Sequence, residues 1–185
     1  SWGVERRDRV AVVLPNGPCM ATVFVGIAAH AECAPLNPAY TRDELVFFLT
    51  DLAAKAVVIP AGLDLPAREV AASLGLKVIE VESSDRQAGA FTLCGAPEHD
   101  GDGPVDWGGG DDIAMVLHTS GTTSRPKQVP LSHRNLCESA ANIADVLMLS
   151  GNDRCLNVMP LFHIHGLVGT LLSSLQSGAS VICAE

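Results

Sequence analysis

The chain has 185 residues, enough for one sizeable hydrophobic core, and its 21 acidic against 12 basic residues give a formal net charge of −9. Because the phosphate backbone of a nucleic acid requires basic patches, this balance disfavours a nucleic-acid-binding protein. A hydrophobic content of 48% with only 4% aromatic residues is typical of helices packed on a sheet and argues against a disordered chain.

The first part of the chain alternates between strand-like and helix-like segments. Apolar runs predict the strands, a proline at the start predicts two of the helices, and a capping box predicts the third. This alternation indicates an α/β fold, with a mostly parallel sheet flanked by helices on both faces. In chain order we expect a strand at 9–15, a helix at 18–31, a helix from Thr41, a strand at 55–60, a helix at 66–75 and a strand at 77–81.

Residues 82–112 interrupt this rhythm with a segment rich in glycine and aspartate, which we interpret as an exposed acidic connection between units 1–81 and 113–185. Its spacing does not match a calcium-binding loop, so solvation explains the acidity better than metal binding. In the second unit we expect strands at 113–119, 129–132, 154–159 and 179–184, a helix capped by Ser132, and a helix at 161–176.

The six cysteines and the apolar runs bound the cellular context. No two cysteines form a C-x-x-C pair, so we expect reduced thiols and no metal site. The longest apolar stretch, residues 19–29, is too short to span a bilayer. Reduced thiols and no recognisable targeting segment suggest a cytoplasmic protein, or a peroxisomal one in a eukaryote. The absence of an initial methionine and the stop just after a strand-like run suggest a fragment.

The segment from Leu117 to His133, LHTSGTTSRPKQVPLSH, gathers hydroxyl side chains, a glycine and a lysine between two expected strands. Small hydroxyl residues and a tight glycine turn let backbone and side-chain donors approach a polyphosphate, and a lysine supplies a point charge. A Walker loop is disfavoured because Pro126 replaces its second glycine, whereas composition alone also permits a plain surface turn. The candidate phosphate-binding residues are Thr119, Ser120, Gly121, Thr122, Thr123, Ser124 and Lys127.

Residues 116–127, VLHTSGTTSRPK, resemble the phosphate-binding signature of the adenylate-forming enzymes, which include acyl-CoA synthetases, non-ribosomal adenylation domains and luciferases. Residues 159–166, MPLFHIHG, resemble the Pro-x-Phe-His element of the same superfamily, and NPAYTRDEL at residues 37–45 also resembles its usual text. The resemblance extends from about Arg9 onward. Together these segments most resemble the oxalate–CoA ligase group, and the fold implied is the N-terminal part of the family's large domain.

The resemblance implies an AMP-forming acid–CoA ligase that uses ATP, Mg²⁺ and CoA. A carboxylate would attack the α-phosphate of ATP, and the thiol of CoA would then displace AMP. Lys127 would stabilise the departing pyrophosphate, and His163 would lie between the nucleotide and the acyl pocket. Oxalate is the first expectation for the acid. A fatty acid, a coumarate or a non-catalytic nucleotide-binding module are the alternatives.

Other family parts, namely the adenine and ribose contacts, an acidic magnesium ligand and the C-terminal domain, would lie beyond Glu185. We therefore expect these 185 residues alone to be inactive and, with exposed edges, to self-associate. One departure from the family pattern is Gln128, where glycine is usual, although replacing it with glycine should be tolerated. His118 is expected to be a strand residue, and His165 a surface group or a second polar contact for a dianion.

Overall fold

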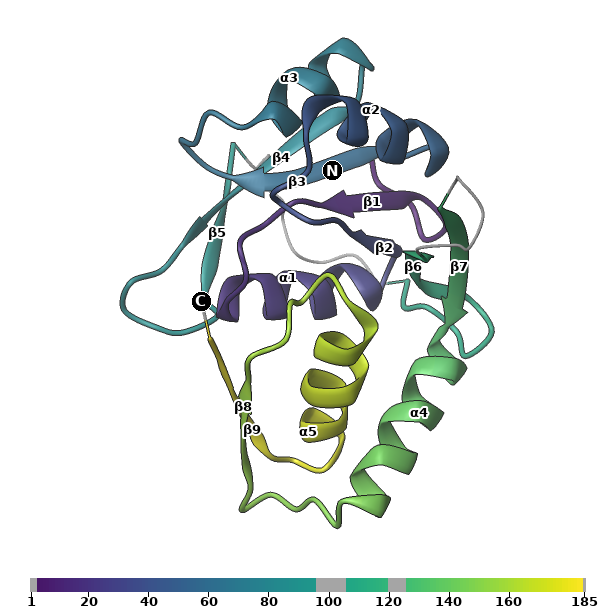
Figure 1. Cartoon of the computed structure of the whole chain (residues 1–185), viewed down its shortest axis with the longest axis vertical. Helices are drawn as coiled ribbons and strands as arrows, with labels where there is room; N and C mark the ends of the chain where they lie inside the picture. The colour runs from purple at the N-terminus through teal and green to yellow at the C-terminus, as the bar shows by residue number, and fades with distance from the viewer. Residues whose placement is uncertain (1–2, 96–105, 120–125, 185) are drawn as a thin grey trace.

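The computed structural model describes residues 3–95, 106–119 and 126–184, and its main sheet has seven strands in the order β5-β4-β3-β1-β2-β6-β7 (Figure 1). Neighbours from β4 to β6 run parallel, and the two edge strands, β5 and β7, are antiparallel to their partners. The strands are β1 Arg9–Val12, β2 Glu32–Pro35, β3 Ala56–Pro60, β4 Lys77–Ser83, β5 Phe91–Cys94, β6 Ile113–Thr119 and β7 Lys127–Ser132.

Helices cover both faces of this sheet, which confirms the predicted α/β class (Figure 1). The alternation along β1 and the residue after it shows the two sides: Val10 and Val12 face the core that includes α1 Pro18–Ala28, whereas Ala11 and Val13 face α2 Arg42–Asp51 and α3 Pro66–Ser73. The first core also receives α4 His133–Val146 and the π-helix η1 His165–Leu172, which continues into α5 Ser173–Gln176.

The local signals in the sequence located several helix starts. The Thr41 hydroxyl accepts from the Glu44 N–H at 3.4 Å, and the Glu44 carboxylate accepts from the Thr41 N–H at 2.8 Å, which completes the predicted capping box. Ser132 caps α4 in the same way, with Asn135 as the reciprocal partner. These caps explain why α2 and α4 begin where the sequence places them.

Three features differ from the expectation. The strand β2 was not predicted, because its four residues, ECAP, lack alternation, and it is defined instead by pairing with β1 and β6. The strand β5 lies inside the expected connection 82–112 and pairs with β4. The helix expected from residue 161 begins at His165 with π geometry. The hydroxyls of Thr170 and Ser173 donate to carbonyls four residues back, which competes with α-helical bonding.

A separate parallel pair of strands, β8 Arg154–Asn157 and β9 Ser180–Cys183, lies beside η1 and α5 (Figure 1). Large apolar side chains are exposed on and near this pair, among them Leu156 at 61%, Val158 at 66% and Ile182 at 49%. In the described part of the chain, no helix has the length and apolar character required to cross a membrane. The six cysteines are free thiols.

Candidate functional site

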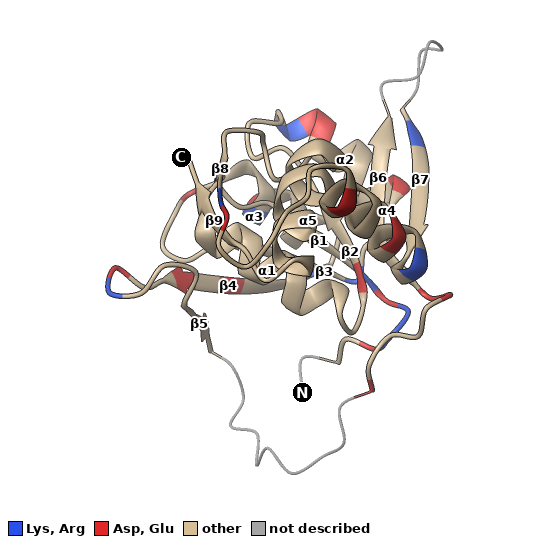
Figure 2. Cartoon of the chain, turned by 90° about the horizontal axis from the view of Figure 1, so that it is seen from below, with Lys and Arg blue, Asp and Glu red and all other residues tan. Residues whose placement is uncertain are grey.

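The strands β6 and β7 form a hairpin whose described end is the pair Thr119 and Lys127 (Figure 2). The Thr119 hydroxyl donates to the Lys127 carbonyl at 3.5 Å, and both residues are exposed. In Figure 2 the blue end of β7 marks its only basic residue, and no described carboxylate pairs with this lysine. Five candidate residues, Ser120, Gly121, Thr122, Thr123 and Ser124, lie outside the described residues.

The buried residues of β6 fix the position of the hairpin at the edge of the sheet. Ala114, Met115 and Val116 of β6 are fully buried between the two cores, which anchors the strand in the sheet beside β2. The following residues, Leu117 and His118, are partly buried, and Thr119 is exposed. The strand therefore carries the chain from the core to the surface, where Thr119 and Lys127 are available to a ligand.

A polar cluster lies one residue pair below that end and joins four elements. We define the base cluster as Arg9 of β1, Asp51 of α2, His118 of β6 and Gln128 of β7. His118 Nε2 lies 2.9 Å from the Asp51 carboxylate, and the Gln128 amide donates to the same carboxylate at 2.8 Å. The Gln128 amide nitrogen also reaches the Asp51 carbonyl at 2.6 Å, and Arg9 donates to the Gln128 amide oxygen at 3.0 Å.

Sequence reasoning treated His118 as a strand residue, which is confirmed, and noted Gln128 only as a departure from a family pattern. It found nothing at Asp51 or Arg9. The contacts join residues 67 to 119 positions apart in the chain, so no local pattern could have indicated them. One indication of the cluster was present in the sequence, namely a glutamine at position 128, where the family pattern usually has glycine.

Hydrogen bonds from His118 and then Gln128 hold the pKa of Asp51 below its ordinary value. Because this pKa is lower in the folded than in the unfolded chain, the resulting stability is complete above the ordinary aspartate pKa of about 3.9 and is lost as the pH falls through the lowered pKa. We predict that the melting-temperature advantage of the full-length protein over its Asp51→Asn variant shrinks as the pH is lowered from neutral to below about 4.

Thermal melts at a series of pH values measure this difference. Asp145→Asn provides a matched control, since Asp145 is an exposed aspartate of α4 whose side chain makes no hydrogen bond in the described part of the chain. An advantage over Asp51→Asn that stays constant across the acid range would contradict the assigned role of the Asp51 carboxylate.

The second candidate, His163, lies in the turn between β8 and η1 and is exposed. Two asparagines hold this turn: the Leu161 N–H donates to the Asn16 side chain and the Met159 N–H to the Asn157 side chain, both at 2.9 Å. The His163 ring packs on Phe162 with centroids 4.7 Å apart. Phe162 therefore packs against a candidate residue and not into the core.

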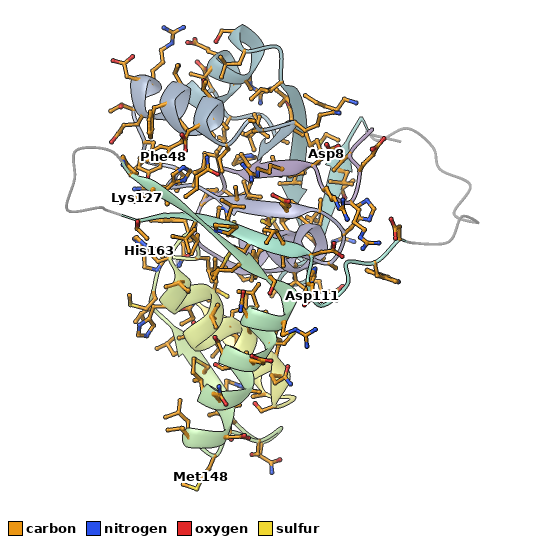
Figure 3. All side chains as sticks on the ribbon, turned by 90° about the vertical axis from the view of Figure 1, so that its right-hand side faces the viewer. Asp8, Phe48, Asp111, Lys127, Met148 and His163 are labelled. Atoms are coloured by element: carbon orange, nitrogen blue, oxygen red, sulfur yellow. The ribbon has the colours of Figure 1, made fainter. Side chains whose placement is uncertain are left out.

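Figure 3 places Lys127 and His163 on the same side of the molecule, the left-hand side in that view. No hydrogen bond joins them among the described residues, and His163 N–H donates only to the Pro160 carbonyl, at 3.1 Å. The arrangement brings a cation on a hairpin and an imidazole on an anchored turn toward one side of the molecule. His165 is exposed at the first residue of η1.

Comparison with known proteins decides the family. The AMP-binding enzyme family matches residues 1–185. The chain belongs to the AMP-binding enzyme family. It is 41% identical to an oxalate–CoA ligase of Arabidopsis thaliana, over 97% of this chain and 35% of the relative, and 37% identical to an oxalate–CoA ligase of Saccharomyces cerevisiae, over 98% of this chain and 38% of the relative.

Solved structures of AMP-binding and CoA ligase relatives share the fold. Apo MatB from Rhodopseudomonas palustris superposes with a TM-score of 0.80 and 29% identity, over 99% of this chain and 36% of that one. A malonyl-CoA ligase bound to methylmalonyl-CoA and AMP gives a TM-score of 0.69 and 33% identity, over 94% of this chain and 34% of that one. The chain thus spans about a third of the length of these relatives.

Proposed function

We propose that the full-length protein is an acid–CoA ligase that activates a carboxylate with ATP, releases pyrophosphate, and transfers the acyl group to CoA. The observation that carries the proposal is the hydroxyl-rich signature of residues 116–127 in a member of the AMP-binding enzyme family. This signature begins in β6 and ends at the first residue of β7. MatB has been solved bound to ATP, and a malonyl-CoA ligase has been solved with a CoA thioester and AMP, which supports ATP and CoA as substrates.

In the first step a carboxylate oxygen forms a bond to the α-phosphorus while the bond to pyrophosphate breaks. Both reactants are anions, so charge neutralisation and positioning dominate the barrier. The Lys127 ammonium stabilises negative charge on the departing pyrophosphate, and the hydroxyl and N–H groups from Thr119 to Ser124 hold the β- and γ-phosphates. His163 contacts the α-phosphate or the carboxylate. The thiol of CoA then displaces AMP.

Magnesium enters this proposal with the nucleotide. Within the described ranges, no three carboxylate, imidazole or thiolate groups converge into a cation site. These residues therefore do not form a protein cage for Mg²⁺, which proteins commonly bind through substrate phosphates and only one or two carboxylates. The ion would reach the site on the phosphates of ATP.

The proposed acid is oxalate, since oxalate–CoA ligases match at 41% and 37% identity, whereas several 4-coumarate–CoA ligases match at 30% to 34%; a further relative at 37% is a probable CoA ligase of Humulus lupulus. We predict that the full-length protein, given ATP, Mg²⁺, CoA and an equimolar mixture of oxalate, coumarate and short and long fatty acids, forms mainly oxalyl-CoA. Mass spectrometry of the thioesters measures the preference. If a coumaroyl or fatty-acyl thioester dominates instead, the proposed ligase reaction stands and oxalate is rejected as the preferred acid.

For residues 1–185 alone, we predict no turnover and concentration-dependent self-association. Leu156 and Ile182 on the two-stranded sheet, and Val158 immediately after β8, expose large apolar side chains, and such surfaces favour association. Light scattering of the isolated chain should show species larger than the monomer, and Leu156→Lys with Val158→Lys should reduce them. A strictly monomeric isolated chain would contradict this expectation.

A further inference from the structure

In the base cluster, the Gln128 side chain at the start of β7 is hydrogen-bonded at both its amide oxygen and its amide nitrogen. The Gln128 side chain uses its amide oxygen to accept from Arg9 and its amide nitrogen to donate twice to Asp51. A glutamine carries one acceptor and one double donor, so its two ends match a guanidinium on one side and a carboxylate with a carbonyl on the other. A glutamate at this position would place a second carboxylate against Asp51.

The partners of Gln128 are themselves fixed. Arg9 also donates to Glu32 at 2.8 Å and to the Leu52 carbonyl at 3.1 Å, so its guanidinium is held by three acceptors. The His118 side chain is only 6% exposed and packs edge-on against Phe48, with ring centroids 4.7 Å apart. The cluster therefore connects β7 to groups anchored in the sheet and in α2.

The position of β7 in the sheet makes this attachment consequential. Among the described residues, β7 is the last strand of the sheet and pairs only with β6, so no described strand forms ladder hydrogen bonds with its second edge. His118 pairs with Gln128, and the next pair in the register is Thr119 with Lys127. The Gln128 side chain instead ties β7 back to β1 and α2, one register pair from the exposed end.

We propose that Gln128 is a positioning residue that fixes the start of β7, and with it the direction of Lys127, through the base cluster. The inference rests on the proposed function in so far as Lys127 acts on ATP. The sequence alone predicts that glycine is tolerated at position 128. The three side-chain hydrogen bonds reverse that expectation, because glycine would remove all of them and loosen the strand beside Lys127.

The test uses the full-length protein and the variant Gln128→Met, which keeps the side-chain length and removes the hydrogen bonds. Gln87→Met is the control, an exposed glutamine between β4 and β5 whose side chain makes no hydrogen bond with described residues. The first measurement is amide hydrogen exchange, which should rise at Thr119 and Lys127 in Gln128→Met and remain unchanged there in Gln87→Met.

The second measurement is a double-mutant cycle in ATP–pyrophosphate exchange. Gln128→Met should lower the exchange rate about tenfold at saturating ATP in the wild-type background, and less than about twofold in the Lys127→Ala background, because its effect passes through Lys127. Gln128→Glu should be at least as damaging as Gln128→Met, since it sets like charges together at Asp51.

The outcomes separate the two proposals. Unchanged amide exchange in Gln128→Met overturns the positioning role whatever the activity, and equal losses in both backgrounds reduce Gln128 to a structural residue that does not act through Lys127. If the wild-type protein shows no pyrophosphate exchange with any of the acids, the proposed function fails. The hydrogen-exchange comparison then decides alone whether Gln128 holds the start of β7.

Discussion

Replacing Lys127 with alanine in the full-length protein should lower ATP–pyrophosphate exchange by at least about 10²-fold while leaving the melting temperature unchanged. The loss is expected because the ammonium group would neutralise charge that develops on the departing pyrophosphate. Stability should persist because Lys127 is exposed and pairs with no described carboxylate. Exchange rates at saturating ATP, together with thermal melts, measure both parts.

Lys55→Ala is the control for removing a positive charge. The exposed Lys55 forms a surface ion pair with the partly buried Asp8 at 3.8 Å, and Figure 3 shows Asp8 well apart from Lys127. Exposed pairs of this kind contribute about 0–1 kcal/mol, so this variant should keep its rate and nearly all its stability. An unaltered exchange rate in folded Lys127→Ala would remove Lys127 from the mechanism.

The second large effect is expected at Gly166, where alanine should displace the turn that carries His163. A Cβ added there would overlap the Pro160 carbonyl oxygen and lie 3.1 Å from the Met159 carbonyl oxygen. Both are backbone atoms of the turn, and the Pro160 carbonyl accepts from the His163 N–H. Overpacking should destabilise the protein by about 1–3 kcal/mol, and the displaced turn should lower pyrophosphate exchange by tenfold or more.

Gly169→Ala is a matched control in the same helix, η1. The atoms nearest to its added Cβ would belong to the His165 ring, at 3.4 Å or more, an ordinary contact with a side chain that can move. Alanine is the better helix former by about 1 kcal/mol, so this variant should be as stable as the wild type or more so, with an unchanged rate. Equal behaviour of the two variants would show that the close approach at Gly166 does not position His163.

Where the sequence predicted structure well, the signal was local. The capping boxes at Thr41 and Ser132 need only the three following residues, and buried strands such as β6 need only an apolar run. The strand β2 depends on two neighbouring strands, so its own four residues did not reveal it. The π geometry of η1, in which the Thr170 and Ser173 hydroxyls donate to carbonyls four residues back, was not indicated by the apolar pattern that predicted a helix there.

In the candidate site, too, the parts that depend on contiguous residues were predicted, and those that depend on distant contacts were not. The hydroxyl-rich segment before Lys127 and the turn around His163 were evident because their residue types and spacing form contiguous motifs. The base cluster was not, since Asp51 meets His118 and Gln128 only after α2 packs beside the hairpin. Residues that support a site from distant elements become visible only in three dimensions.

The most direct test of the central claim is ATP–pyrophosphate exchange by the full-length protein with Mg²⁺ and a carboxylate but without CoA. Adenylation is the only step that can return labelled pyrophosphate to ATP, so exchange that depends on added oxalate is the predicted result. Exchange with another acid would preserve the chemistry. A folded protein that binds ATP yet exchanges pyrophosphate with none of oxalate, fatty acids or coumarate would contradict the account and leave a nucleotide-binding module.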